Sequence, residues 1–234
     1  MKQALLLLHG ALGSAAQLQS LADLLKESAA VYTLSFSGHG GEALLPEKFT
    51  MQHFAGQVQE FVDTLGSGPV HVFGYSMGGY AALLAAQQAP QQFASITTLG
   101  TKFDWSPATA EEATRFLDPE KMLAKVPAFA EQLRQLHAPT AWQAVVTGTA
   151  ALMRGLGEQP PLTPDVLATI KTPTLVLVGD ADNTAGPEAS RSYAAHLPQA
   201  GFEVLPATSH PLERVDVALL TDKILGFMAR HPAG

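Results

Sequence analysis

The sequence contains no cysteine among its 234 residues. This absence excludes disulfide bridges, thiolate zinc sites and a cysteine nucleophile. Basic residues are also scarce, with 14 lysines and arginines against 21 aspartates and glutamates, so the formal net charge is −7. Binding to nucleic acid depends on basic side chains that neutralise phosphates. The composition therefore predicts no nucleic-acid partner.

Long hydrophobic runs are missing as well. No stretch approaches the roughly 20 apolar residues that a membrane-spanning helix needs. The first eight residues, MKQALLLL, superficially resemble a signal peptide, but their apolar core is short and His9-Gly10 interrupts it. We therefore expect neither a leader nor a membrane span. Since the absence of cysteine also fits a reducing compartment, the sequence predicts a cytoplasmic protein.

Short apolar runs alternate with amphipathic segments along a chain that is 47% hydrophobic and 15% charged, which is enough to bury a single large core. Near-continuous apolar runs are typical of parallel strands that are covered on both faces. We predict strands at Ala4–Leu8, Ala30–Leu34, Val70–Phe73, Ala94–Leu99, Thr174–Val178 and Phe202–Leu205, and helices at Thr50–Leu65, Pro187–Leu197 and Leu212–Met228. This alternation predicts an α/β fold with a doubly wound, mostly parallel sheet of about six strands.

One segment interrupts the alternation. Residues 102–171 contain no convincing strand, but Asp118-Pro119 and Thr163-Pro164 are typical helix starts, with an N-cap followed by proline. We predict a helical cap, or lid, inserted at 102–171 into a core formed by 1–101 and 172–234. Phe103 and Trp105 lie nearest the preceding strand end and are the predicted substrate contacts, whereas the other apolar cap residues are expected to pack the insertion.

The motif Gly74-Tyr75-Ser76-Met77-Gly78-Gly79 lies between an apolar strand and an alanine-rich helical stretch. A serine flanked by glycines at this junction indicates a sharp, strained strand-to-helix turn that exposes the hydroxyl. The pattern predicts that Ser76 is a nucleophile. The peptide N–H of Met77, at the start of the helix, is then directed at a developing oxyanion.

Other chemical groups also follow predicted strands. The loop His9-Gly10-Ala11-Leu12-Gly13-Ser14 can direct the N–H of Ala11 inward as a second oxyanion donor, with His9 itself binding loop backbone. His210 follows the sixth predicted strand and is the predicted base, since a serine hydroxyl at neutral pH needs an imidazole to take its proton. An aspartate after the fifth strand, Asp180 or Asp182, is expected to orient this imidazole.

Together these motifs resemble the α/β-hydrolase superfamily, and in particular a small cytoplasmic, serine esterase-like member with a helical cap. The resemblance rests on the His9–Ser14 loop, the turn Gly38-His39-Gly40, the elbow Gly74–Gly79, the segment Gly179–Asp182 and Ser209-His210. It covers the whole chain apart from the cap. The chain departs from the pattern because the leading β-hairpin is missing and Ser209 replaces the usual glycine before the histidine.

The resemblance also bears on the acid. The Gly-x-x-Asp spacing from Gly179 favours Asp182 as the partner of His210, while Asp180 remains an alternative and Asp104 is a third, because some members place the acid after the fourth strand.

This superfamily implies acyl transfer to water through an acyl-serine, without a metal or another cofactor. The expected substrate is a small or medium, largely apolar ester or related acyl compound. A serine nucleophile argues against the branches that attack with aspartate. Two alternatives stay open, a ligand-binding or receptor-type hydrolase with slow turnover and a carbon–carbon bond hydrolase or lyase that uses the same residues.

Overall fold

The computed structural model describes residues 2–233. The strands are β1 (Ala4–Leu8), β2 (Ala30–Leu34), β3 (Val70–Tyr75), β4 (Phe93–Leu99), β5 (Thr174–Gly179) and β6 (Ala200–Leu205). The α-helices are α1 (Gln19–Leu25), α2 (Met51–Leu65), α3 (Met77–Gln88), α4 (Pro107–Thr114), α5 (Pro119–Lys125), α6 (Pro127–His137), α7 (Trp142–Glu158), α8 (Pro164–Leu167), α9 (Pro187–Ala194) and α10 (Val217–Arg230). Short 3₁₀ segments η1 (Ala15–Leu18), η2 (Pro46–Lys48), η3 (Pro90–Gln92) and η4 (Leu212–Arg214) occur in the connections.

The six strands form one sheet in the order β2-β1-β3-β4-β5-β6, and every neighbouring pair is parallel. The predicted α/β fold with a doubly wound sheet of about six strands is confirmed. The predicted helix at Leu212–Met228 differs in one respect. It is divided into η4 and α10, because the Asp216 side chain caps α10 by accepting the N–H groups of Ala218 and Leu219.

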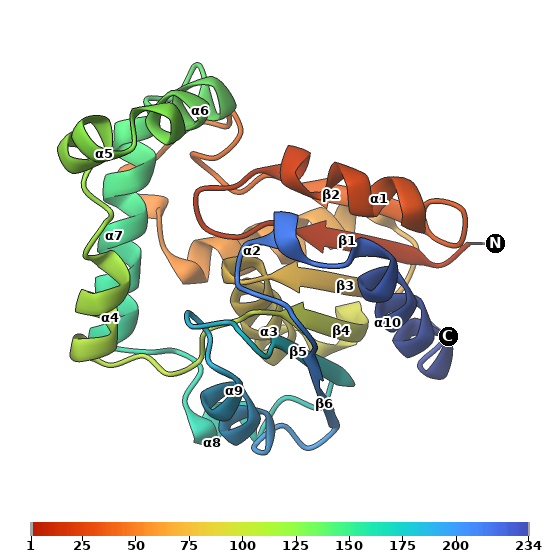
Figure 1. Ribbon diagram of the computed structural model, residues 1–234. Coiled ribbons are helices and arrows are strands. Elements are labelled where there is room, and N and C mark those ends of the chain that lie inside the picture. The colour runs from red at the N-terminus through yellow and green to blue at the C-terminus, as the bar shows by residue number, and fades with distance from the viewer. Residues whose placement is uncertain (1, 234) are drawn as a thin grey trace.

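Side chains of successive strand residues point to opposite faces of the sheet, and β1 shows the result. Leu5 and Leu7 are buried on the face that α1 and α10 cover. Leu6 and Leu8 are buried on the opposite face, which α2, α3 and α9 cover. Because both faces are covered, the central strands read as continuous apolar runs rather than as alternating ones (Figure 1).

The segment between β4 and β5 carries α4 to α8, and we refer to its residues 102–171 as the cap segment. Figure 1 shows α4, α5, α6 and α7 to one side of the sheet, beyond the carboxyl ends of the strands. The cap segment has a small core of its own, made of Met122, Ala130, Leu133, Trp142 and Val146. Both predicted helix starts are observed, since Asp118 caps α5 and Thr163 caps α8. In the part of the chain that the structure describes, none of the helices combines the length and apolarity required to cross a membrane.

Candidate active site

Ser76 occupies the turn between β3 and α3 in a backbone conformation that side chains rarely adopt, with φ 51° and ψ −112°. The surrounding chain holds this conformation. The N–H of Ser76 donates to the carbonyl of Leu99 at 2.8 Å, and the carbonyl of Ser76 accepts the hydroxyl of Thr101 at 3.0 Å. Such strain persists at functional sites when neighbouring structure over-determines it. The elbow geometry expected from the sequence is therefore present.

The glycines around Ser76 permit close backbone approach. A Cβ atom on Gly78 would lie 2.5 Å from the carbonyl oxygen of Leu8, and one on Gly10 would lie 2.7 Å from the ring of Tyr75. Both distances are shorter than a real Cβ contact allows. These glycines thus bring the start of α3 and the loop after β1 together beside Ser76.

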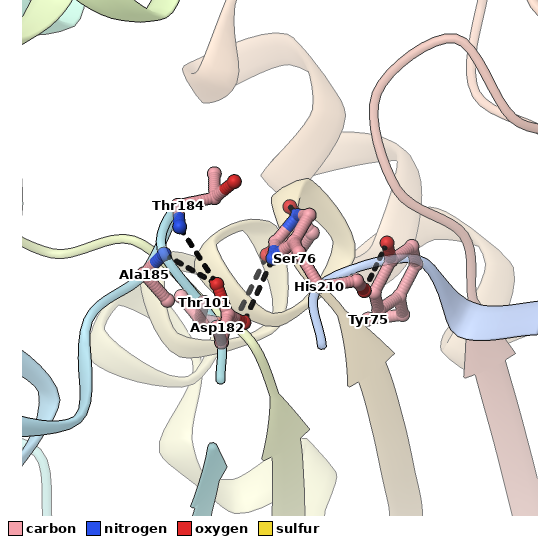
Figure 2. A network of polar contacts seen from close by, with 7 residues as sticks. All are labelled: Tyr75, Ser76, Thr101, Asp182, Thr184, Ala185 and His210. Carbon is pink, nitrogen blue, oxygen red and sulfur yellow. Dashed lines mark hydrogen bonds and ion pairs between the residues drawn. The ribbon is translucent and has the colours of Figure 1, made fainter. Parts of the chain in front are cut away.

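Three side chains from separate loops form one hydrogen-bonded line at the carboxyl ends of β3, β5 and β6 (Figure 2). The Ser76 Oγ lies 3.3 Å from Nε2 of His210, and Nδ1 of His210 lies 2.8 Å from Oδ2 of Asp182. With its proton on Nδ1, the imidazole donates to Asp182 and leaves Nε2 free to accept the serine proton. The structure brings together the three residues that the sequence predicts as catalytic.

The Asp182 carboxylate is only 2% exposed. Burial by itself raises the pKa of this group, but the hydrogen bond and charge of His210 and the N–H groups of Ala185 and Thr184 outweigh it, so the pKa lies below its ordinary value. Oδ1 accepts those two N–H groups at 2.9 and 2.8 Å. Asp182 is consequently held as a carboxylate, with its second oxygen directed at the imidazole.

The two alternative acids lie elsewhere. Asp180 is exposed, and its carboxylate accepts the N–H groups of Ala207 at 2.9 Å and Thr208 at 3.0 Å, which lowers its pKa. It thereby joins the loop after β5 to the loop that leads to His210. The carboxylate of Asp104 forms no hydrogen bond or ion pair with any of residues 2–233. Neither group contacts the imidazole.

The peptide N–H groups of Ala11 and Met77 are the oxyanion donors that the sequence predicts. Both residues line the cavity beside Ser76, and neither N–H donates a hydrogen bond to another described residue. His9 holds the loop that carries Ala11, since its Nδ1–H donates to the carbonyl of Gly10 at 2.7 Å and its Nε2 accepts the N–H of Phe36 at 3.1 Å. As the sequence suggested, His9 binds loop backbone.

Behind this loop, His9 belongs to a cluster of three buried histidines. The ring centroids of His9 and His39 are 5.0 Å apart, and those of His39 and His137 are 5.7 Å apart. Nδ1 of His137, at the end of α6, accepts the N–H of Gly40 at 3.0 Å, so the cluster also ties the cap segment to the core. Burial lowers the pKa of His9 to about 4 and also lowers the pKa of the other two. All three are therefore neutral in the folded protein near pH 7.

A cavity of about 320 Å³ opens beside Ser76. Its walls come from the two N–H-bearing residues, from α2 and α3, from the cap segment and from the loop after β5. Trp105, one of the two predicted substrate contacts, lines it together with Leu152, Met153 and Leu156 of α7. Phe103 does not line it. Phe103 is 1% exposed and stacks on Tyr193 at 5.9 Å, so it packs the start of the cap segment onto α9.

Sequence reasoning missed several residues that support this site. The hydroxyl of Tyr75 donates to the carbonyl of His210, and Thr101 supports Ser76. Lys102 lines the cavity, as do Asn183 and Thr184. Thr101 and Lys102 follow β4 after Gly100, and Asn183 follows Asp182, so a search of strand ends for polar side chains would have found them. The contact of Tyr75 carries no such signal, because it depends on how two distant segments meet.

Within residues 2–233, no group of three or more histidine, aspartate or glutamate side chains is arranged to hold a metal ion.

Comparison with known families identifies the family to which this architecture belongs. The family model described as the alpha/beta hydrolase fold matches residues 3–141, more than half of the sequence, and the chain belongs to this family. Membership of this family supports a hydrolase activity.

Individual relatives agree with the assignment. The chain is 27% identical over 201 residues to 3-oxoadipate enol-lactonase 1 of Acinetobacter baylyi, with 79% of this chain and 73% of the relative covered. A thermophilic esterase from Thermogutta terrifontis superposes with a TM-score of 0.79 at 24% identity, covering 98% of this chain and 91% of that one. NosK from Streptomyces actuosus gives a TM-score of 0.85 at 20% identity, with 99% of both chains covered. At these identities, the two solved structures share the fold.

Proposed function

We propose that this chain is a serine hydrolase that cleaves a small or medium, largely apolar ester or related acyl compound through an acyl-serine intermediate. The observation that carries the proposal is the continuous line from Ser76 Oγ to His210 Nε2 and from His210 Nδ1 to Asp182, at the wall of a cavity. A relative named as an enol-lactonase supports it, because opening a lactone is also acyl transfer to water.

In the proposed reaction, His210 Nε2 takes the hydroxyl proton of Ser76 as Oγ attacks the substrate carbonyl. The oxygen of the tetrahedral intermediate accepts the N–H groups of Ala11 and Met77, which form no hydrogen bond with residues 2–233. Asp182 stabilises the imidazolium. His210 then gives its proton to the departing alcohol, and the acyl group remains on Ser76.

The second half of the reaction repeats these steps with water. His210 takes a proton from water, the resulting hydroxide attacks the acyl-serine carbonyl, and the protonated imidazole returns a proton to Ser76 Oγ. The products are the carboxylic acid and the free enzyme. In this scheme residues 1–101 and 172–234 carry the chemistry, while the cap segment, 102–171, acts as the lid that selects the acyl or alcohol group.

A fluorophosphonate probe and a series of p-nitrophenyl esters test the proposal. The probe is expected to label Ser76, and Ser76→Ala is expected to abolish labelling and ester hydrolysis while circular dichroism stays unchanged. A Ser76→Ala enzyme with full activity on the esters would rule out the acyl-serine. Labelling of Ser76 without turnover of any ester would instead favour the ligand-binding alternative.

A further inference from the structure

We propose that the cavity takes an acyl substrate carrying a carboxylate away from the scissile bond, and that Lys102 binds this carboxylate. The inference rests on the proposed function in one respect, since it treats the cavity beside Ser76 as the substrate site. It adds a charged subsite to a cavity that is otherwise largely apolar.

Lys102 is placed for this role by the strand that precedes it. It follows β4 after Gly100 and Thr101, and it lines the same cavity as Ser76. Its side chain is partly buried, yet no carboxylate among residues 2–233 lies within 4.0 Å of its ammonium group, which also donates no hydrogen bond there. A cation that has lost part of its hydration without gaining a partner is stabilised when an anion binds.

The charges around Lys102 also favour the binding of an anion in the cavity. Burial lowers the pKa of Lys102, although the charges of Asp104 and Glu112 act in the opposite direction from beyond ion-pair distance. The cavity is lined by two cations, Lys102 and Arg115, and one carboxylate, Glu112, whereas the chain as a whole has a net charge of −7. A cavity with this local balance in an acidic protein attracts anions.

Trp105 contacts both the backbone and the side chain of Lys102. The indole N–H of Trp105 donates to the carbonyl of Lys102 at 3.0 Å, and the ammonium lies 5.3 Å from the centre of the indole ring. This cation–π contact fixes the side chain without neutralising its charge. A single ammonium fits a carboxylate better than a phosphate dianion, because phosphate sites combine several donors, such as a helix N-terminus or an arginine fork. Arg115, the second cation, is exposed and stacks on Phe116.

The test compares two esters of one acid, p-nitrophenyl hydrogen glutarate, which carries a carboxylate, and its neutral methyl ester. The measured quantity is the ratio of kcat/KM for the charged ester to kcat/KM for the neutral one. Lys102→Met is expected to lower this ratio by tenfold or more, in line with a charge-assisted contact in a partly buried site. Lys102→Arg is expected to keep most of it. Lys125→Met, which removes an exposed cation at the end of α5, is the matched control and is expected to leave the ratio unchanged.

Glu112→Gln also tests the anion site, but is expected to change the ratio of kcat/KM values in the opposite direction. Removing the one carboxylate that lines the cavity is expected to raise the ratio, because it takes away repulsion of the substrate anion. If Lys102→Met lowered kcat/KM for both esters equally, Lys102 would have a structural role, and if it left both kcat/KM values unchanged, the substrate would lie away from Lys102. Either result overturns the inference.

Calorimetry separates this inference from the proposed function. Glutarate is expected to bind the Ser76→Ala protein, and adding Lys102→Met is expected to weaken its binding at least tenfold. Equal binding to both proteins would overturn the anion site. Tighter, Lys102-dependent binding of inorganic phosphate than of glutarate would overturn the assignment to a carboxylate. Since binding needs no turnover, failure of the acyl-serine mechanism is detected by the fluorophosphonate experiment alone.

Discussion

The hydroxyl of Tyr75 donates a hydrogen bond of 2.9 Å to the carbonyl of His210, although 135 residues separate them in the sequence. Tyr75 is the residue immediately before Ser76, so the last residue of β3 anchors the loop that carries the proposed base. Its ring also lies 5.5 Å from the imidazole ring. The elbow therefore positions both Ser76 and the loop of His210, the two groups that exchange a proton in the proposed reaction.

Tyr75→Phe removes this hydrogen bond and keeps the ring. We expect the free energy of unfolding to fall by about 1 kcal/mol, and kcat to fall several-fold with little change in KM, because the imidazole is placed less accurately. Steady-state kinetics and urea unfolding measure both effects. Tyr32→Phe is the control, since the hydroxyl of this exposed tyrosine forms no hydrogen bond with residues 2–233. An unchanged kcat in Tyr75→Phe would show that the contact has no positioning role.

Replacing each of the three candidate acids by asparagine is expected to change kcat on one ester to a different extent. Asp182→Asn is expected to lower kcat by several orders of magnitude, because it removes the carboxylate that accepts the Nδ1–H of His210. Asp180→Asn is expected to have a moderate effect, through weaker bonds to Ala207 and Thr208, and Asp104→Asn almost none. A near-normal Asp182→Asn enzyme beside an inactive variant at either other site would contradict the assignment.

Gly100 lies against the Asp182–His210 pair. A Cβ atom at this position would lie 3.0 Å from Oδ2 of Asp182 and 3.2 Å from Nδ1 of His210, and its φ is +62°. Gly100→Ala is therefore expected to lower kcat by at least tenfold and stability by about 1–2 kcal/mol. Gly66→Ala is the matched control, since its φ is +58° but nothing lies within 4 Å of the added atom. It is expected to show the same loss of stability and normal activity, measured by the same assays.

The two aromatic residues after β4 are expected to behave differently. Trp105→Ala enlarges the cavity and is expected to shift activity toward longer acyl chains in a p-nitrophenyl ester series, each methylene contributing about 1–3 kcal/mol. Phe103→Ala removes a buried ring and is expected to cost about 3–5 kcal/mol of stability without a change in chain-length preference. A changed preference in Phe103→Ala alone would mean that Phe103, rather than Trp105, faces the substrate.

Stability is expected to depend on pH through buried histidines. Burial lowers the pKa of His9 and of His71 to about 4, against about 6.5 in the unfolded chain. Between these values the unfolded state binds protons that the folded state excludes. The free energy of unfolding is therefore expected to be highest above pH 6.5. It is expected to fall as the pH drops toward 4, by about 1.4 kcal/mol per pH unit for each histidine.

Urea unfolding at pH 7.0, 6.0 and 5.0 measures this slope. His9→Gln is expected to reduce it, because one of the buried histidines with a lowered pKa is removed. The lowered pKa values of Asp180 and Asp182 contribute only below this range, since the ordinary value of an aspartate is 3.8. A free energy of unfolding that stays constant from pH 7 to pH 5 would contradict the prediction.

The sequence predicted the sheet well because its signals are local. The runs at Ala4–Leu8 and Ala30–Leu34 coincide with β1 and β2. The run of β1 is continuously apolar because both of its faces are covered, whereas β2 lies at the edge of the sheet and is only partly buried. The glycines around Ser76 likewise indicate the elbow, because only they permit the close backbone contacts. The positions of Asp182 and His210 could be predicted because both follow strands, and the carboxyl ends of parallel strands meet at one edge of the sheet.

The directions in which side chains of the cap segment point could not be predicted from the sequence. Phe103 and Trp105 are two residues apart, and no local pattern states which of them packs against Tyr193 and which lines the cavity. The bond between Gly40 and His137 and the bond between Tyr75 and His210 join distant segments. Such contacts are fixed by packing of the whole fold, so periodicity and motif spacing do not reveal them.

In the proposed mechanism, the base lies on the loop after β6, which is the last strand in the sequence and an edge of the sheet. During synthesis the loop of Ala11 and the turn of Ser76 emerge first, and they can assemble as β1, β3 and β4 pair. His210 comes later, on the loop that follows β6, and β6 pairs only with β5. A nascent chain that extends only to β4 therefore contains Ser76 but lacks His210, the proposed base. In the proposed mechanism, hydrolysis therefore requires β6 to pair with β5, because this pairing precedes the loop that carries His210.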